Sequence, residues 1–200
     1  MTANNNLEVE IKFHVPELNA FRQRLVATGA RQIKPRTYER NIRFDNAWEG
    51  LRRKGQLLRL RQDDHARLTF KGIPPDQAPT EVKVREELEV EVSDFDTLAQ
   101  LLEKIGLEPL QVYEKYRETF ALGSVEIVLD EMPFGNFVEL EGPEKQIKQL
   151  AGRLSLDWDR RVLPNYLALM GMLIKHHDLP FQDLTFANFA DTDISIADIL

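Results

Sequence analysis

Two carboxylates and an ammonium group alternate near the N-terminus, in the stretch LEVEIKF (7–13). Alternate side chains of a strand share a face, so Glu8, Glu10 and Lys12 would project together, opposite four apolar residues. Carboxylates are hard oxygen ligands for Mg²⁺ or Mn²⁺, and an ammonium group binds phosphate oxygens. The stretch therefore predicts either a solvated strand face or a site for a metal and an anion.

The same alternation recurs along the chain and predicts about eight strands. After 7–13 they are 39–45, 56–62, 66–72, 82–92, 113–120, 125–130 and 137–142. One side of each strand is apolar. The other sides carry Glu8, Glu10, Lys12, Arg43, Arg59, Arg61, Arg67, Lys71, Lys83, Arg85, Glu87, Glu89, Lys115, Arg117, Glu126, Asp130, Glu139 and Glu141.

Four helices are expected between and after these strands. One runs from Pro16 to near Gly29, one from an Asp cap to Gly106, and two more start at Pro143 and Pro164. Each of the three prolines is expected in a first helical turn. The segment 72–79, rich in proline and glycine, is expected to be an exposed loop.

Two architectures remain open for the charged strand faces. An antiparallel sheet can turn its polar side to water. Alternatively, the sheet curls with its apolar side outward under the helices, so that the charged side lines a lumen large enough for one small ligand. Charges in such a lumen are costly unless they are paired, so it requires a highly charged ligand and a metal. Because charge fills this face on eight strands, we expect an α+β fold: a closed eight-stranded antiparallel β-barrel with helices packed outside.

Composition limits the functional classes. The chain has 200 residues, is 42% hydrophobic and 30% charged, and contains no cysteine, which excludes disulfides and thiolate sites and fits a cytoplasmic protein. The start MTANNN lacks the features of a signal peptide, and no apolar run approaches the ~20 residues that cross a bilayer, so no membrane partner is expected. A net charge of −7 argues against a nucleic-acid partner. Oligomeric state stays open, a homodimer included.

The ordered set of charged motifs resembles the CYTH proteins, or triphosphate tunnel metalloenzymes. Their E-x-E-x-K signature is present as Glu8 to Lys12. It is followed, in the family's order, by Arg59 and Arg61 in LLRLRQ, Lys71 in LTFKG, Arg85, Glu87 and Glu89 in VREELE, Lys115 and Arg117 in YEKYRE, Asp130 in IVLDE, and Glu139 and Glu141 in GNFVELEG. The resemblance extends to the helix that contains Tyr166 and implies an eight-stranded tunnel.

The resemblance also implies roles for these residues. Catalysis would depend on Glu8, Glu10 and Lys12. One or two Mg²⁺ or Mn²⁺ ions would be held by Glu8, Glu10, Asp130, Glu139 and Glu141. A small-molecule triphosphate would be bound by Lys12, Arg59, Arg61, Lys71, Arg85, Lys115 and Arg117, with Glu87 and Glu89 in support. Family members also place a basic residue of the C-terminal helix at the tunnel mouth, and here only Lys175 or Arg161 is available.

The expected reaction is metal-dependent hydrolysis of a triphosphate: inorganic triphosphate, a nucleoside triphosphate or thiamine triphosphate. The alternatives are a class IV adenylate cyclase, which converts ATP to cyclic AMP and pyrophosphate, and a binding module that holds polyphosphate or a nucleotide without turnover. Tyr166 and the stripe Leu167, Met170 and Leu173 are interpreted as packing.

Near the C-terminus, Leu184, Phe189, Ile194 and Ile199 are spaced five residues apart. This spacing is similar to that of pentapeptide repeats, whose central apolar residues point into a solenoid. We therefore expect a tunnel domain over residues 1–178 and a repeat-like tail over residues 182–200.

Overall fold

A computed structural model describes residues 7–74 and 80–200 of the chain. The predicted loop at 72–79 lies largely outside these residues. The chain forms two compact units. The first contains the chain up to Glu8 together with Glu39–Tyr113, and the second contains Val9–Tyr38 and Glu114–Leu200.

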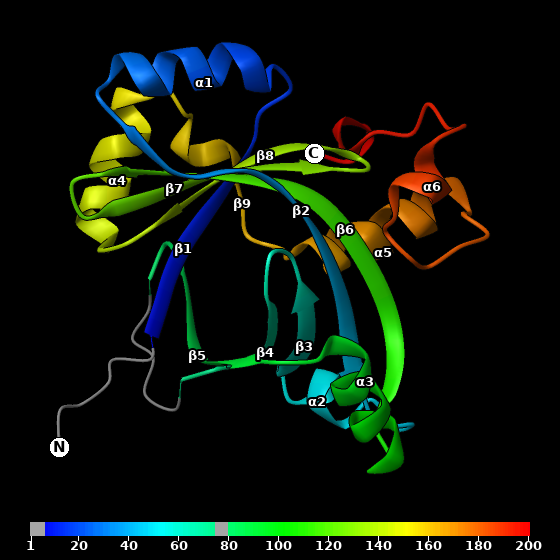
Figure 1. The fold of residues 1–200 in the computed structure, drawn as a ribbon. Helices are drawn as coiled ribbons and strands as arrows, with labels where there is room; N and C mark the ends of the chain where they lie inside the picture. Colours follow the sequence, from blue (N-terminus) through cyan, green and yellow to red (C-terminus); the bar gives the residue numbers. More distant parts are fainter. Residues whose placement is uncertain (1–6, 75–79) are drawn as a thin grey trace, which may run out of the picture. The chain divides into compact units, whose positions relative to one another are not determined.

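Eight long strands and one short strand form the sheet (Figure 1). They are β1 (Leu7–His14), β2 (Arg31–Asp45), β3 (Leu57–Gln62), β4 (Ala66–Gly72), β5 (Lys83–Val92), β6 (Glu108–Leu122), β7 (Val125–Met132), β8 (Gly135–Glu141) and β9 (Arg161–Val162). All eight predicted strands are present. The sequence pattern missed β9, residues 31–38 of β2 and residues 108–112 of β6.

The strand order is β5-β4-β3-β2-β6-β7-β8-β1-β9, and β5 additionally pairs with β1. This extra pairing joins the two ends of the eight-stranded series, so the sheet is a closed antiparallel barrel. Closure removes the exposed edges that an open sheet would present. The predicted α+β fold class is confirmed.

Four of the helices begin and end close to the predicted positions, and the other two, each of four residues, were not predicted. They are α1 (Leu18–Ala27), α2 (Gly50–Arg53), α3 (Phe95–Lys104), α4 (Glu144–Arg153), α5 (Tyr166–His177) and α6 (Phe186–Phe189), with 3-10 turns η1 (Trp158–Arg160) and η2 (Ile196–Asp198). Asp94 caps α3 by accepting a hydrogen bond from the Thr97 amide. The prolines lie earlier than predicted: Pro143 is the N-cap of α4, whereas Pro16 and Pro164 precede the caps Glu17 and Asn165.

In the first unit, apolar residues of β2 and β3 pack against α3. Ile42, Phe44 and Leu60 form a buried cluster with Phe95 and Leu102 of that helix. Because residues two apart share a strand face, this packing directs Glu39, Asn41 and Arg43 to the other face of β2.

In the second unit, the apolar sides of β1, β7 and β8 are buried, as Ile11, Leu129 and Leu140 illustrate. Helices α1 and α4 lie next to each other beside β7 and β8 (Figure 1), and they contribute the buried Phe21 and Ile147. Burial of these sides orients Glu10 and Lys12, as well as Glu139, to the opposite face. No helix within residues 7–74 and 80–200 combines the length and apolar character needed to span a bilayer.

The C-terminal segment packs within the second unit through helical turns. Leu184 and Phe189 are buried as the five-residue spacing predicts, but the next buried side chain is Ile196, not Ile194. The pattern of burial expected for a pentapeptide repeat is therefore wrong here, because α6 and η2 set the side-chain directions. Ile196 donates its amide hydrogen to the Phe134 carbonyl and lies against Gly135, where an added Cβ would approach its Cγ2 to 2.8 Å.

Candidate active site

Asp130 is the centre of a buried ion network in the second unit, which we call the Asp130 network: Lys12, Lys115, Arg117, Asp130, Glu139 and Tyr166. Asp130 lies on β7 opposite Phe137 of β8 and opposite Arg117 of β6. Its carboxylate accepts hydrogen bonds from Arg117 Nε at 2.7 Å and Lys115 Nζ at 3.1 Å. Asp130 is 0% exposed and Lys115 is 2% exposed. These charges are therefore neutralised inside the protein.

Lys12 and Glu139 extend this network from β1 and β8. They are directly opposite each other in the β1–β8 register, and Lys12 Nζ lies 2.5 Å from Glu139 Oε1. Arg117 Nη2 also donates to Glu139 Oε2 at 2.6 Å, so Arg117 joins Asp130 to Glu139. The ion pairs thus connect four strands, β1 near the N-terminus with β6, β7 and β8.

The pKa values of the network reflect strong internal pairing. Burial alone would raise the pKa of Glu139, but Lys12, Arg117 and Lys115 hold it well below its ordinary value. Burial would lower the pKa of Lys12, but Glu139 and nearby carboxylates raise it above 10.5. Both groups are therefore ionised at neutral pH.

Tyr166, the first residue of α5, belongs to this network. Its phenol donates a hydrogen bond to Asp130 Oδ2 at 2.8 Å, and Lys12 Nζ lies 4.2 Å from the centre of its ring. Burial, then Asp130 and Glu139, raise the pKa of the phenol well above 10. Tyr166 packs against Phe137, as the sequence interpretation expected, and in addition its hydroxyl group binds the network, which was not expected. The sequence signal that was available is its position just after the N-cap Asn165, which fixes the start of α5.

Glu10 and Glu141 form an acidic pair beside the network. They are directly opposite in the β1–β8 register, and Glu126 of β7 is opposite Glu141. Glu10 is buried, and carboxylates are the ligands that divalent cations such as Mg²⁺ prefer. Among residues 7–74 and 80–200, however, no three His, Cys, Asp or Glu side chains are grouped to hold a metal as they stand. The carboxylates of Glu139 and Asp130 instead form ion pairs with lysine and arginine side chains.

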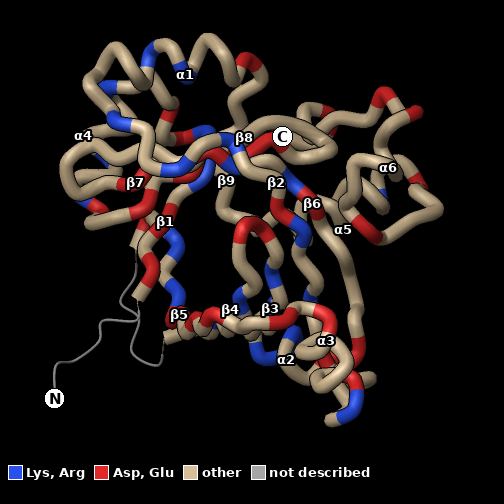
Figure 2. The backbone as a smooth tube through the Cα atoms, in the orientation of Figure 1, with Lys and Arg blue, Asp and Glu red and all other residues tan. Residues whose placement is uncertain are grey.

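A second set of predicted residues lies in the first unit. Lys71 of β4 contacts Glu8 at 2.5 Å and Glu87 of β5 at 3.1 Å. Glu8 and Glu10 share the charged face of β1, yet they belong to different compact units. Figure 2 shows close alternation of cationic and anionic residues along β1 and along β3–β5. Lys71 is therefore held between two carboxylates.

Arg59 is the centre of the other charged group of this unit, which we call the Arg59 cluster: Arg43, Arg59, Arg61, Thr69, Glu89 and Tyr113. Arg59 donates to two neutral groups, Tyr113 Oη and Thr69 Oγ1, each at 3.3 Å. Its nearest ion-pair contact is Glu89 Oε2 at 3.9 Å. Arg61 donates to Glu89 at 3.2 Å. Glu89 thus lies closer to Arg61 than to Arg59.

Arg43 lies directly opposite Arg59 in the β2–β3 register. Arg43 is 9% exposed and Arg59 is 8% exposed, so two guanidinium groups are buried side by side. Asp45, 3.5 Å from Arg43, is already engaged by the backbone amides of Leu51 and Arg52. Arg43 Nη2 and Arg59 Nε have no hydrogen-bond acceptor among the residues that the structure describes. This pair is suited to a bound anion.

The structure thus places the predicted residues in separate groups. Lys12, Lys115, Arg117, Asp130 and Glu139 form one connected network, with Glu10 and Glu141 paired beside it. Glu8, Lys71 and Glu87 form another group, while Arg59, Arg61 and Glu89 form a third. Arg85 is half-buried on β5, on the same face as Glu87 and Glu89. Arg43, Tyr113 and Tyr166 were not among the predicted site residues.

Neither basic candidate for the tunnel mouth joins the Asp130 network by a described contact. Lys175 is exposed in the last turn of α5. Arg161 lies on β9, opposite Phe13, and donates to the Trp158 carbonyl at 2.9 Å. Helix α5 instead contributes Tyr166 to the network.

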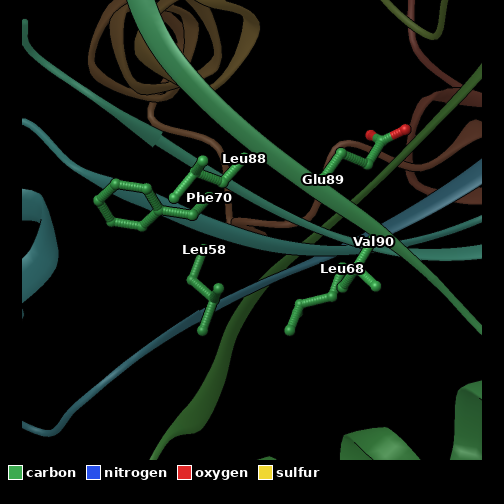
Figure 3. Close-up of a pocket in the computed structure, with 6 residues that line it drawn as sticks. All are labelled: Leu58, Leu68, Phe70, Leu88, Glu89 and Val90. Carbon is green, nitrogen blue, oxygen red and sulfur yellow. The ribbon is translucent and has the colours of Figure 1, made fainter. Parts of the chain in front are cut away.

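An apolar pocket lies on the other side of β3–β5 from the Arg59 cluster. It is lined by Leu58, Leu68, Phe70, Leu88 and Val90, with Glu89 at its border. Figure 3 shows the Glu89 carboxylate directed away from the apolar side chains. Glu89 is the one charged residue among the described residues that line this pocket, so the candidate chemistry lies on the charged face.

Fold and side chains define an α+β protein with a closed antiparallel barrel and buried, ion-rich strand faces. The CYTH domain family model matches residues 6–161, and the chain belongs to that family. It is 27% identical over 178 residues to a Methanocaldococcus jannaschii protein named "Putative adenylate cyclase", a match covering 83% of this chain and 99% of the relative.

Two solved structures share the fold. A Vibrio parahaemolyticus protein described as a "putative adenylate cyclase" has a TM-score of 0.73 and 22% identity, covering 82% of this chain and 98% of its own. A Hippeastrum protein has a TM-score of 0.58 and 18% identity, and the match covers 82% of this chain and 93% of that chain. Its structure is described as revealing "a dominant triphosphatase activity" in a "putative adenylyl cyclase".

Proposed function

We propose that this protein is a divalent-metal-dependent enzyme that hydrolyses a small-molecule triphosphate. The observation that carries the proposal is the buried pair Arg43 and Arg59: Arg43 Nη2 and Arg59 Nε have no acceptor in residues 7–74 and 80–200, and such donors suit an anion with several oxygens. Guanidinium groups bind phosphate through paired, charge-assisted hydrogen bonds. Membership of the CYTH family extends the proposal from an anion to a triphosphate.

The proposal assigns triphosphate binding to Lys12, Arg59, Arg61, Lys71, Arg85, Lys115 and Arg117, to which Arg43 is added. Their assignment to a common function rests on membership of the CYTH family. Their cationic groups would neutralise charge that spreads over the phosphoryl oxygens during transfer. Glu87 and Glu89 would orient the cations that they contact. The activity is placed within residues 1–178, with residues 182–200 in support of the fold.

Metal binding is assigned to Glu8, Glu10, Asp130, Glu139 and Glu141, with Mg²⁺ or Mn²⁺ as the ion. A bound divalent ion supplies Lewis-acid charge neutralisation and orients the nucleophile. The strand register supports this assignment, because it places Glu10 opposite Glu141 and so brings together two carboxylates of the kind that bind Mg²⁺ or Mn²⁺. Glu139 contacts Lys12 at 2.5 Å, so its participation requires Lys12 to turn from this carboxylate toward the phosphate. Glu8, Glu10 and Lys12 would be the catalytic residues on β1.

Adenylate cyclase activity is the second candidate, because the Methanocaldococcus jannaschii relative carries that name. In that reaction the ribose 3′ hydroxyl attacks the α-phosphorus and pyrophosphate leaves. Water as nucleophile gives hydrolysis instead. The two reactions use the same kind of cationic site and differ in how the organic end of the substrate is held.

One assay distinguishes these reactions. ATP, inorganic triphosphate and thiamine triphosphate are each supplied with Mg²⁺ or Mn²⁺, and phosphate, pyrophosphate and cyclic nucleotide are separated. Release of phosphate supports the triphosphatase, and cyclic AMP with pyrophosphate supports the cyclase. Binding of a triphosphate with none of these products would instead support a binding module.

Glu10→Gln tests the role of the metal carboxylates. Turnover should fall by roughly a hundredfold or more, since one charged ligand is lost, while metal-free triphosphate binding persists. Glu126→Gln is the matched control, because Glu126 is opposite Glu141 as Glu10 is, but it is exposed. Equal turnover in wild type and Glu10→Gln would remove Glu10 from the proposed role.

A further inference from the structure

Asn41 is a neutral side chain in the most ionic part of the first unit. It lies on β2 between Glu39 and Arg43 on the same strand face, and directly opposite Arg61 of β3. The other face of β2 carries Ile42 in the core under α3. Asn41 is therefore fixed on the charged side by the packing of its neighbours.

The amide group of Asn41 is buried in an unusual state for a polar side chain. The residue is 0% exposed, and neither Nδ2 nor Oδ1 has a hydrogen-bond partner within the described part of the chain. Burial of an unpaired amide opposes folding, because both its donor and its acceptor give up water. The site thus retains a group that destabilises the unliganded protein, which indicates a partner in the liganded one.

The surrounding atoms define what such a partner must offer. Three donors suit phosphate oxygens and have no acceptor in the described part of the chain: Arg43 Nη2, Arg59 Nε and Asn41 Nδ2. Asn41 Oδ1 is different, because it can only accept a hydrogen bond. An ionised inorganic triphosphate offers oxygens that accept, so it would leave Oδ1 unpaired.

We infer that Asn41 is a specificity-determining residue, which accepts a hydrogen bond from a hydroxyl or amino group on the organic end of a nucleoside triphosphate. This inference rests on the proposed function and narrows its substrate class. The site then favours an organic triphosphate with an O–H or N–H donor over inorganic triphosphate. A site built to bond such a group discriminates strongly against analogues that lack it.

Asn41→Leu tests the inference, because leucine has nearly the same shape without polar atoms. We expect kcat/KM for ATP to fall about tenfold, the loss of one buried hydrogen bond, and that for inorganic triphosphate to change by less than about twofold. Methyl triphosphate, which has an organic end without a donor, should follow inorganic triphosphate. The melting temperature of the unliganded variant should be equal to or higher than that of wild type. Asn41→Ala is measured in parallel and should show the same change in selectivity.

Thr69→Val is the matched control. Thr69 is equally buried and polar, but its hydroxyl donates to Glu89 at 2.8 Å and accepts from Arg59. Its replacement should lower the melting temperature and affect ATP and inorganic triphosphate by the same factor. A selectivity change in Thr69→Val equal to that in Asn41→Leu would overturn the inference.

The source of the hydrogen-bond donor is resolved by the same data. If a metal-bound water supplied it, Asn41→Leu would weaken all three triphosphates alike, and the inference would fail. No change with any substrate would also overturn it. If the wild-type protein turns over none of the three triphosphates, the proposed function fails, but the inference about Asn41 can still be tested. Calorimetry without metal then measures the affinities of ATP and inorganic triphosphate and shows whether Asn41→Leu abolishes a preference for ATP.

Discussion

The Asp130 network and the Arg59 cluster both contain buried ions, but only in the Asp130 network does every cation lie close to a carboxylate. Lys12, Lys115 and Arg117 each contact a carboxylate oxygen at 3.1 Å or less. Arg43 and Arg59 are about as buried, yet their nearest carboxylate oxygens lie 3.5 and 3.9 Å away.

Because of this difference, we expect one set to contribute mainly to stability and the other mainly to ligand binding. Removal of one partner from a closed buried network leaves an uncompensated charge, which is strongly destabilising. A buried cation without a close anion already opposes folding, so its removal costs little and chiefly weakens the binding of an anion. The Asp130 network should therefore control stability, and the Arg59 cluster should control affinity.

Asp130→Asn should give the largest change in stability. The substitution leaves Lys115 buried without its carboxylate, so the free energy of unfolding should fall by about 3–5 kcal/mol. Glu131→Gln is the matched control on the next residue of β7, where the Arg36 pair is much more exposed and should be worth about 0–1 kcal/mol. Urea denaturation of both variants measures the difference. Similar losses would show that burial does not distinguish the two pairs.

Arg59→Leu should give the opposite result. The free energy of unfolding should change by less than about 1 kcal/mol, because the arginine donates only to neutral groups, at 3.3 Å. Metal-free affinity for inorganic triphosphate should fall by about 1.5–3 kcal/mol, the range for hydrogen bonds to charged groups. Arg52→Leu, an exposed arginine of the same unit, should leave both quantities unchanged. A large loss of stability in Arg59→Leu would contradict the contrast between the two sets.

The sequence predicted the strands and their charged faces because alternation depends only on neighbouring residues. Lys12, Arg117 and Glu139 therefore appeared on the expected faces. Their separation into networks was not predictable, since it depends on strand register: Lys12 meets Glu139 because β1 pairs with β8. Register is a property of the closed sheet and does not appear in any single strand.

Two of the residues that the sequence did not reveal share one physical feature. Tyr166 and Tyr113 are aromatic residues whose hydroxyl groups reach charged partners, and an aromatic residue in a sequence pattern first suggests packing. Asn41 was overlooked for a related reason, because a neutral amide is an ordinary member of a polar strand face.

The tail was misinterpreted because a spacing of five residues was taken as a structural period, whereas capped turns place Ile196 inside.

The pH dependence of stability should also differ between the two sets. The stabilisation due to the lowered pKa of Glu139 is complete above the ordinary carboxylate value of about 4.3 and is lost as the pH falls through the folded value. The raised pKa values of Lys12 and Tyr166 give stability that is complete below about 10 and is lost at higher pH. Burial lowers the pKa of Arg59, but Tyr113 and nearby carboxylates raise it overall, so Arg59 stays charged throughout.

Urea denaturation between about pH 3 and 11, the range over which these groups titrate, therefore distinguishes the Asp130 network from the Arg59 cluster. Arg59→Leu should keep both the acid and the alkaline loss of stability seen in wild type. Glu139→Gln should reduce the acid loss, because the group that must be protonated is absent. If Glu139→Gln lost as much stability at low pH as wild type does, other carboxylates would be responsible for that loss.

Tyr166→Phe should have the smallest effect and tests whether α5 acts on the network through a single hydrogen bond. The ring stays in place under Lys12, and Asp130 keeps Lys115 and Arg117, so only the 2.8 Å bond to Asp130 is lost. The free energy of unfolding should fall by about 1 kcal/mol. A double-mutant cycle with Asp130→Asn should show a coupling energy of roughly 0.5–1.5 kcal/mol between the two residues. Zero coupling would mean that the phenol stabilises α5 by packing alone, and the Asp130 network would then end at the strands.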